Sequence, residues 1–498
     1  MRKYATKANL IFDLKNYLYI LLSLPLLLAN CKHDVQNPNP QQTVAHNYPE
    51  NIKTIIVDKC ATAGCHNATS YKAAGNLRLD SWSFLFDGSS NGAVVVPYNA
   101  DNSSLLYFVN TDEALGTVAI PTMPYNAPHL TRDEYFTLRD WINNGAPDAN
   151  GAIAFSTNPD TRQKVYTVQQ GCDLVAVADA EKNVVMRYIT VGQSFGTENP
   201  NNIVISADGK YAYVSFWNAP LIQKIDTETD SVIAELNTSN SFQKAIQISN
   251  DGTRLIASNW FSHDLILIDA TTMQIIKNLG TSLRFLGGFA EDSKGNFYAT
   301  SQFGNTVYKI APDGSYTSIS IDGLPTTTSS TTTTPDPISI LMNADKSKYF
   351  VTCTNTNEVR VLDAATDQLI KTISVGGNPQ QMALAPNSNK LFVTCMNDTL
   401  TKIEVGSLYV IDENSYEVVK KITNKFFQPY GIAVDQKNNK LFIFNRNEDK
   451  NGPPPHHQSP CNGRNGFYQV YDLNTLTPAT NKRFEVTVDP YASAIRFK

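Results

Sequence analysis

The chain has 498 residues, of which 42% are hydrophobic and 17% are charged, and its formal net charge is −5. This length allows two or three domains with proper hydrophobic cores. A mildly acidic chain with few charges has no electrostatic footprint for nucleic acid. No Ser-His-Asp, paired-carboxylate or phosphate-loop arrangement supports a hydrolase or a nucleotide-binding protein.

The first thirty residues predict an export signal. An apolar run at 17–28 follows the basic residues Arg2, Lys3 and Lys7. It is too short to span a membrane and ends in Leu-Ala-Asn-Cys. Cleavage would make Cys31 the lipid-bearing first residue of the mature chain, although Asn30 departs from the small residue usual before such a cysteine. The alternative is an uncleaved signal anchor. A polar, Pro-rich tether at 31–48 follows, and we therefore expect a lipid-anchored protein of the cell envelope, on the periplasmic or surface face of the outer membrane.

A cysteine pair followed at once by a histidine comes next, in Cys60, Cys65 and His66. Covalent attachment of haem c uses two thiols that form thioethers to the porphyrin vinyl groups and an adjacent histidine that reaches the iron. The usual run has two residues between the cysteines, and the four found here resemble a less common variant of the motif. The alternative is a small disulfide loop with a chance histidine. Export favours haem, because haem c is attached outside the cytoplasm.

Five further runs follow the motif in order. They are Gly75–Asp80, Val96–Pro97, Ser103–Leu106, Pro121–Pro124 and Leu130–Ala146. This order resembles the small single-haem cytochrome c domains of bacterial surface and periplasmic proteins, over about residues 50–150. The resemblance implies that Met123, in the Met-Pro run, is the second axial ligand, with His129 as its rival. We expect an all-α cytochrome c-like domain at 49–150 that carries one covalent haem c.

The last of these runs predicts a helix. Thr131 would cap it, and Glu134, three residues on, completes a capping box. Its apolar residues recur at helical spacing, at Tyr135, Leu138, Trp141 and Ile142. We expect this apolar face to pack on the edge of the haem.

From about residue 164 the chain repeats a unit of four short strands. Full copies run over 200–236, 244–279, 285–321, 337–375, 379–422 and 429–486. A period of about 40–50 residues with four strands per unit is typical of a β-propeller. The segment 165–191 supplies only three strands, and Ala494–Lys498 reads as the missing inner one. We therefore expect an all-β, seven-bladed propeller at 160–498, sealed by the C-terminus.

The repeat also carries a family resemblance. Tyr213-Val214-Ser215 and Phe350-Val351-Thr352 stand where the YVTN-type propellers have their name-giving run. Those propellers are kin to amine-dehydrogenase large subunits. The resemblance implies the fold and says little about function.

One loop of the last blade differs from the repeat, at 451–466, between the second and third strands. It holds His456, His457 and Arg464 in a Gly/Pro-rich setting, on the face that surrounds the mouth of the central channel. Such a loop could bind a metal, contact the haem domain or hold an anionic substrate. The alternative is a rigid surface loop with incidental histidines.

The remaining cysteines predict one disulfide. Cys172 lies in the loop of the first blade that corresponds to the loop holding Cys461 in the seventh, and ring closure makes these blades neighbours. We therefore predict a Cys172–Cys461 bond, which an exported compartment allows. Cys353 and Cys395 occupy equivalent strand positions in adjacent blades, too far apart for a bond, and should be free thiols.

Three functions stay open. In the one we favour, a lipid-anchored c-type cytochrome transfers electrons, and the propeller docks a redox partner protein or a small-molecule donor or acceptor. In the second, the chain is an oxidoreductase with its own propeller-borne site, whose catalytic residues the sequence does not identify. In the third, the propeller is a surface binding or scaffold protein without redox turnover. Haem loading separates the third function from the others, and a substrate-driven change of haem colour separates the first two.

Overall fold

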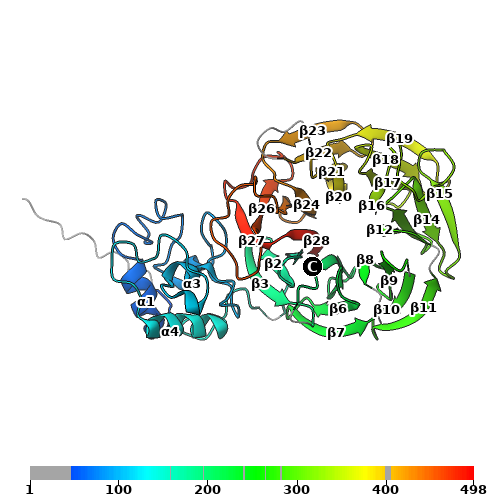
Figure 1. Cartoon of the computed structure of the whole chain (residues 1–498). Coiled ribbons are helices and arrows are strands. Elements are labelled where there is room, and N and C mark those ends of the chain that lie inside the picture. Colours follow the sequence, from blue (N-terminus) through cyan, green and yellow to red (C-terminus); the bar gives the residue numbers. More distant parts are fainter. Residues whose placement is uncertain are drawn as a thin grey trace, which may run out of the picture. The chain divides into compact units, whose positions relative to one another are not determined.

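The propeller is a ring of seven four-stranded antiparallel sheets around a central channel (Figure 1). The computed structural model describes residues 46–157, 159–193, 196–238, 242–263, 265–280, 283–398 and 405–497. The predicted signal peptide, Cys31 and most of the tether lie outside these residues. Within them, no helix is long and apolar enough to cross a membrane.

From the channel outwards, the strands of the seven blades follow in order. The first three blades are β28 (Pro490–Arg496), β1 (Lys164–Gln169), β2 (Leu174–Asp179), β3 (Val184–Thr190); β4 (Pro200–Ile205), β5 (Tyr211–Phe216), β6 (Leu221–Asp226), β7 (Ser231–Asn237); and β8 (Gln243–Ile248), β9 (Arg254–Asn259), β10 (Leu265–Asp269), β11 (Gln274–Gly280). The next two are β12 (Leu286–Glu291), β13 (Phe297–Ser301), β14 (Thr306–Ile310), β15 (Tyr316–Ser320); and β16 (Pro337–Met342), β17 (Lys348–Cys353), β18 (Glu358–Asp363), β19 (Leu369–Ser374). The last two are β20 (Pro379–Ala385), β21 (Lys390–Cys395), β22 (Ser407–Asp412), β23 (Val418–Thr423); and β24 (Pro429–Asp435), β25 (Lys440–Asn445), β26 (Asn465–Asp472), β27 (Phe484–Val488). A short 3-10 helix, Pro386–Ser388, follows β20.

The hydrophobic cores of the propeller lie between the blades. Each junction between neighbouring blades holds an apolar cluster drawn from both sheets, and the first and seventh blades share one as well. The middle strands are therefore covered on both faces, and their sequences are largely apolar, as in Leu174–Asp179. The outermost strands have one open face, and β7 alternates between exposed and half-buried residues.

A recurring turn joins the third strand to the fourth in six of the blades. An aspartate at the end of the third strand accepts hydrogen bonds from the backbone N–H groups two and three residues on, as Asp226 does from Glu228 and Thr229. The residue four positions after that aspartate has a positive φ, as Asp230 does at 52°. Aspartate is suited to this turn because its short carboxylate reaches its own backbone. The turns therefore have a local cause that the sequence repeats.

The C-terminal strand closes the ring as predicted, but it spans Pro490–Arg496 and not Ala494–Lys498. β28 pairs antiparallel with β1, so that Lys164 lies opposite Arg496. Both side chains are fully buried, and both reach Asp160, at 2.6 Å from Lys164 Nζ and 3.3 Å from Arg496 Nη1. Burial opposes ionisation of Asp160, but Lys164 and Arg496 outweigh it and hold the pKa of this carboxyl below its usual value. Arg496 also donates to Thr227 O of the second blade, at 2.8 Å.

The N-terminal part of the described chain is a small helical region. Its helices are α1 (Glu50–Cys60), α2 (Trp82–Leu85), α3 (Ser104–Val109) and α4 (Arg132–Asn143), with a 3-10 helix at Glu113–Leu115. The predicted capping box is present, because Thr131 and Glu134 exchange side-chain-to-backbone hydrogen bonds. The four predicted apolar residues of α4 are all buried, in a core shared with α1.

We expect the last five residues to be needed for a stable ring. Deleting Ala494–Lys498 removes part of the inner strand and leaves Asp160 without Arg496, and breaking a buried ion pair costs about 3–5 kcal/mol. Urea unfolding should show a free energy of unfolding lower by at least about 3 kcal/mol. Deleting only 497–498, where Phe497 is exposed, should cost little. An unchanged midpoint in the longer truncation would contradict the role given to closure.

Candidate functional site

Cys60 and Cys65 lie at the end of α1 and in the loop that follows it. His66 N–H donates to Cys60 O at 3.2 Å, so the loop returns to the helix end despite its four intervening residues. Gly64 makes this return at φ 82°, a conformation that favours glycine. Both thiols are free. Cys60 is buried, and this burial raises the pKa of its thiol to about 12. The alternative of a disulfide loop is therefore not what the structure shows.

The imidazole of His66 is held by backbone groups of Leu77 and Ala74. Its Nδ1 lies 3.1 Å from Leu77 O, and a neutral ring donates a hydrogen there, which leaves Nε2 for a ligand. Leu79 N–H donates to His66 O at 2.8 Å, so the run Gly75–Asp80 positions the histidine from both sides. Burial lowers the pKa of His66 and favours the neutral form, which is the form that binds metals. These features fit an axial haem ligand.

Met123 and His129 have different surroundings. Met123 is half-buried and packs on the helical core that also contains Cys60. Its N–H donates to Phe108 O of α3 at 2.6 Å, which fixes the loop. His129 is exposed and lines an open hollow together with residues 121–122 and 125–128. A thioether beside the core suits the second ligand better than an exposed imidazole does.

The loop predicted at 451–466 lies between β25 and β26, except that its last two residues already belong to β26, and it contacts the helical region. His46–Lys498 cluster as one unit. Within it, the His456 ring lies 5.1 Å from that of Phe108, and the His457 ring lies 5.5 Å from that of Tyr107. The two histidine planes are 86° apart, so they do not share one direction. Among the described residues, no group of three or more His, Cys, Asp or Glu side chains is placed to hold a metal ion. Of the three roles considered for this loop, the structure shows contact with the helical region.

Arg464 serves the loop itself. Its guanidinium donates to Asn447 O, Gly452 O and Pro453 O at 2.9–3.2 Å. The side chain is therefore occupied by backbone carbonyls and does not join the two histidines.

Glu485 of β27 holds the histidine-bearing loop against the helical region. Its carboxylate accepts from His456 N–H, and its own N–H donates to Asn91 O at 2.9 Å. Its Oε2 lies 3.1 Å from His457 Nδ1, within ion-pair distance but not aligned as a hydrogen bond. Burial raises the pKa of Glu485 to about 7 and lowers that of His457 to about 4. Both side chains are therefore neutral near pH 6.

Cys172 and Cys461 are joined by a disulfide, with their Cα atoms 5.4 Å apart. This is the pairing that the blade order predicted. It ties the loop after β1 to the histidine-bearing loop of the seventh blade. Cys353 and Cys395 are buried free thiols, and burial raises the pKa of Cys395 to about 12.

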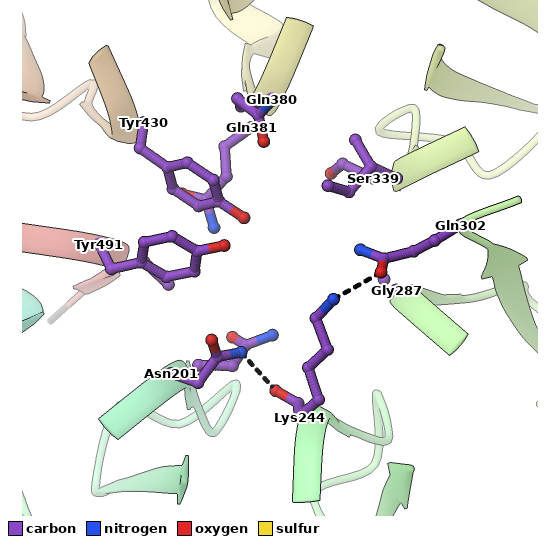
Figure 2. A pocket seen from close by; sticks show the side chains of 13 residues that line it. Asn201, Lys244, Gly287, Gln302, Ser339, Gln380, Gln381, Tyr430 and Tyr491 are labelled. Carbon is purple, nitrogen blue, oxygen red and sulfur yellow. Dashed lines mark hydrogen bonds between the residues drawn. The ribbon is translucent and has the colours of Figure 1, made fainter. Parts of the chain in front are cut away.

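The sequence analysis missed a small cavity of about 50 Å³ in the central channel. Lys244, Tyr430 and Tyr491 point into it, together with neutral amide side chains (Figure 2). Each of these three residues is the second residue of an inner strand. Counting from the start of each inner strand would have found them.

Comparisons with known proteins concern both parts of the chain. A family model described as Planctomycete cytochrome C (PSCyt1) matches residues 63–117. The match includes Cys65 and His66 and leaves out Cys60 and Met123. No curated protein matches the chain.

Two solved structures resemble the chain. A functionally unknown protein from Desulfotomaculum acetoxidans DSM 771 is 14% identical, over 67% of this chain and 99% of that one, with a TM-score of 0.52. Hydrazine synthase of Kuenenia stuttgartiensis is 16% identical, over 60% of this chain and 92% of that one, with a TM-score of 0.47. At 14% identity, the likeness to the first structure shows the fold alone. The TM-score of the second structure is too low to support an inference.

We predict that peptide mapping without reduction recovers Cys172 bonded to Cys461. Cys353 and Cys395 should react with an alkylating agent only after unfolding, because both are buried. Replacing Cys172 and Cys461 together by serine should lower the free energy of unfolding by about 2–4 kcal/mol. A free Cys461, or one bonded to Cys353 or Cys395, would show that the loop geometry is wrong.

Glu485 should make the stability depend on pH. Its folded pKa of about 7 lies above the usual value, so the stability it confers is present below about pH 4 and is lost as the pH rises through 7. Glu485→Gln cannot ionise, and its free energy of unfolding relative to wild type should rise by roughly 2 kcal/mol between pH 5 and pH 8. The exposed Glu417→Gln is the matched control, with no such rise. A flat difference for both variants would refute the assignment.

Proposed function

We propose that this protein is a lipid-anchored c-type cytochrome that works outside the cytoplasm and transfers electrons through one covalent haem. The observation that carries the proposal is the arrangement of two free thiols around a histidine whose Nδ1 is tied to Leu77 O. The family match supports haem c in general, because it covers this histidine. The predicted export signal and the predicted lipid site at Cys31 agree with haem c attachment outside the cytoplasm.

The residues of the helical region would divide the task of holding the haem. Cys60 and Cys65 would form the thioether bonds, His66 would be one axial ligand and Met123 the other. A haem bound here would supply one-electron transfer, at a potential that the axial ligands and burial tune. The His66 ring is positioned by Leu77 O at its Nδ1, and the His66 backbone carbonyl accepts the N–H of Leu79. The core that contains α1 and α4 would exclude water from the porphyrin.

The propeller would act as the docking body for a redox partner protein or a small-molecule donor or acceptor. Its histidine-bearing loop contacts Phe108 and Tyr107 of α3, and the Phe108 carbonyl accepts the N–H of Met123. Phe108 therefore connects the loop to Met123, the proposed ligand, through a ring contact and a backbone hydrogen bond. This continuity supports a function in which the two parts act together.

The identity of the second ligand can be tested by substitution. Replacing Met123 by alanine should remove the weak long-wavelength band typical of methionine-ligated ferric haem and lower the reduction potential, because a thioether favours the ferrous state. His129→Ala should leave both unchanged. A wild-type spectrum of bis-histidine type would contradict the assignment to Met123.

Extraction of haem from cysteine variants tests the covalent link. After denaturation and acid extraction, the haem absorbance should stay with the wild-type chain and be lost from a Cys60→Ser/Cys65→Ser double variant. Cys353→Ser/Cys395→Ser removes the same number of free thiols and should keep it. Purified mature chain whose mass includes no haem would defeat the proposed function.

A further inference from the structure

The channel mouth of the propeller is lined by equivalent residues of all seven blades. The second residue of each inner strand lines the cavity. These residues are Asn201, Lys244, Gly287, Ile338, Gln380, Tyr430 and Tyr491. Asn202, Ser339 and Gln381 at third positions, and Gln302 after β13, add hydrogen-bonding groups. In the described part of the chain, Lys244 is the one charged residue that lines this cavity, so a protonated Lys244 gives the mouth a positive charge.

Lys244 is held by neutral groups alone. Its Nζ donates to Gln302 Oε1 at 2.6 Å and lies 5.0 and 5.5 Å from the ring centres of Trp217 and Trp260. Trp260 Nε1 donates to the same amide oxygen at 2.8 Å. No carboxylate pairs with Lys244 among the described residues, and burial lowers its pKa to about 7. A lysine placed in this way lacks a counter-ion, and an anion in the channel would supply one.

Two tyrosines face Lys244 across the cavity. The rings of Tyr430 and Tyr491 stack with their centres 3.7 Å apart, and their hydroxyl groups point into the channel (Figure 2). Arg446 lies behind them, 4.8 Å from the Tyr491 ring, but its guanidinium is bound by Asp489 at 2.6 and 2.8 Å. The charge of Arg446 is therefore neutralised away from the cavity. The tyrosines offer hydroxyl groups, and Lys244 offers a cation that no described carboxylate neutralises.

An aromatic cluster adjoins the lysine side of the cavity. Trp217 and Trp260 follow the second strands of their blades, at the end where the inner strands begin. The rings in contact with them belong to Phe261, Phe285 and Phe303. Phe261 is 54% exposed. The negative face of an aromatic ring attracts the positive edges of C–H groups, so this surface suits a ring that is apolar on one face and hydroxylated at its rim.

We propose that the channel mouth binds a sugar acid, with its carboxylate at Lys244 and the tyrosine hydroxyls and its ring against Trp217 and Trp260. The small cavity fits a carboxylate group, while the aromatic cluster and the amides of Asn201, Gln302 and Gln380 suit a hydroxylated ring. This binding does not depend on the haem. If the protein does not bind a sugar acid, the proposed electron transfer is not contradicted.

Isothermal titration of the full mature chain with D-glucuronate at pH 6 tests the proposal. We expect saturable binding, and at least tenfold weaker binding of D-glucose and of D-glucuronamide, which lack the carboxylate. Affinity for glucuronate should fall between pH 6 and pH 8, because Lys244 loses its proton near pH 7. Equal affinity for the acid and its amide, or no binding at millimolar concentration, would overturn the proposal.

Substitution identifies the residue responsible. Lys244→Met should weaken glucuronate binding at least tenfold and abolish its pH dependence. Lys210→Met removes an exposed lysine from the turn between β4 and β5, which does not line the cavity, and should bind like wild type. A thermal unfolding midpoint close to that of wild type establishes that each variant is folded. If folded Lys244→Met binds glucuronate like wild type, the site is not the channel mouth.

Discussion

The pairing of β28 with β1 is the constraint on which the other features depend. It joins residues 490–496 to residues 164–169 and buries Lys164, Arg496 and Asp160 at the seam. A buried network of this kind is costly if one member is lost, so the ring favours this one closure. The seam makes the first and seventh blades neighbours. This proximity brings Cys172 close to Cys461. It also completes the channel lining, because Tyr491 of β28 stacks on Tyr430 of β24.

The helical region attaches to the same two blades. Asp87 pairs with Lys182, which follows β2, and Glu485 of β27 bonds to the backbone at Asn91. Val96 joins the apolar cluster between the seventh and first blades. The attachment therefore combines polar contacts with burial of apolar surface, which is the larger contribution to association. The surface to which the helical region attaches includes residues of both the first and the seventh blade. It is therefore complete only when the ring is closed.

The features that the sequence predicted have local or topological causes. The strands repeat because every blade needs the same burial pattern, and the α4 cap depends on residues three apart. The disulfide followed from the cyclic order of the blades alone. The contacts of His456 with Phe108 and the position of Lys244 beside Gln302 depend on how separate elements pack, which no local pattern encodes. Arg464 shows the same limit, because the carbonyls that occupy it come from the folded shape of its own loop.

The histidine-bearing loop explains how a long, Gly/Pro-rich segment can present a defined surface. A free loop of this composition would lose conformational entropy on docking, which weakens association. Here that ordering is achieved within the propeller, by the Cys172–Cys461 bond, by Arg464 on three carbonyls and by Glu485 on the backbone of His456. The rings of His456 and His457 are then held in place for α3. A contact made by such a preorganised loop stays well defined at the interface. In the function we propose, electron transfer between the helical region and a partner on the propeller would follow a path that is fixed in this way.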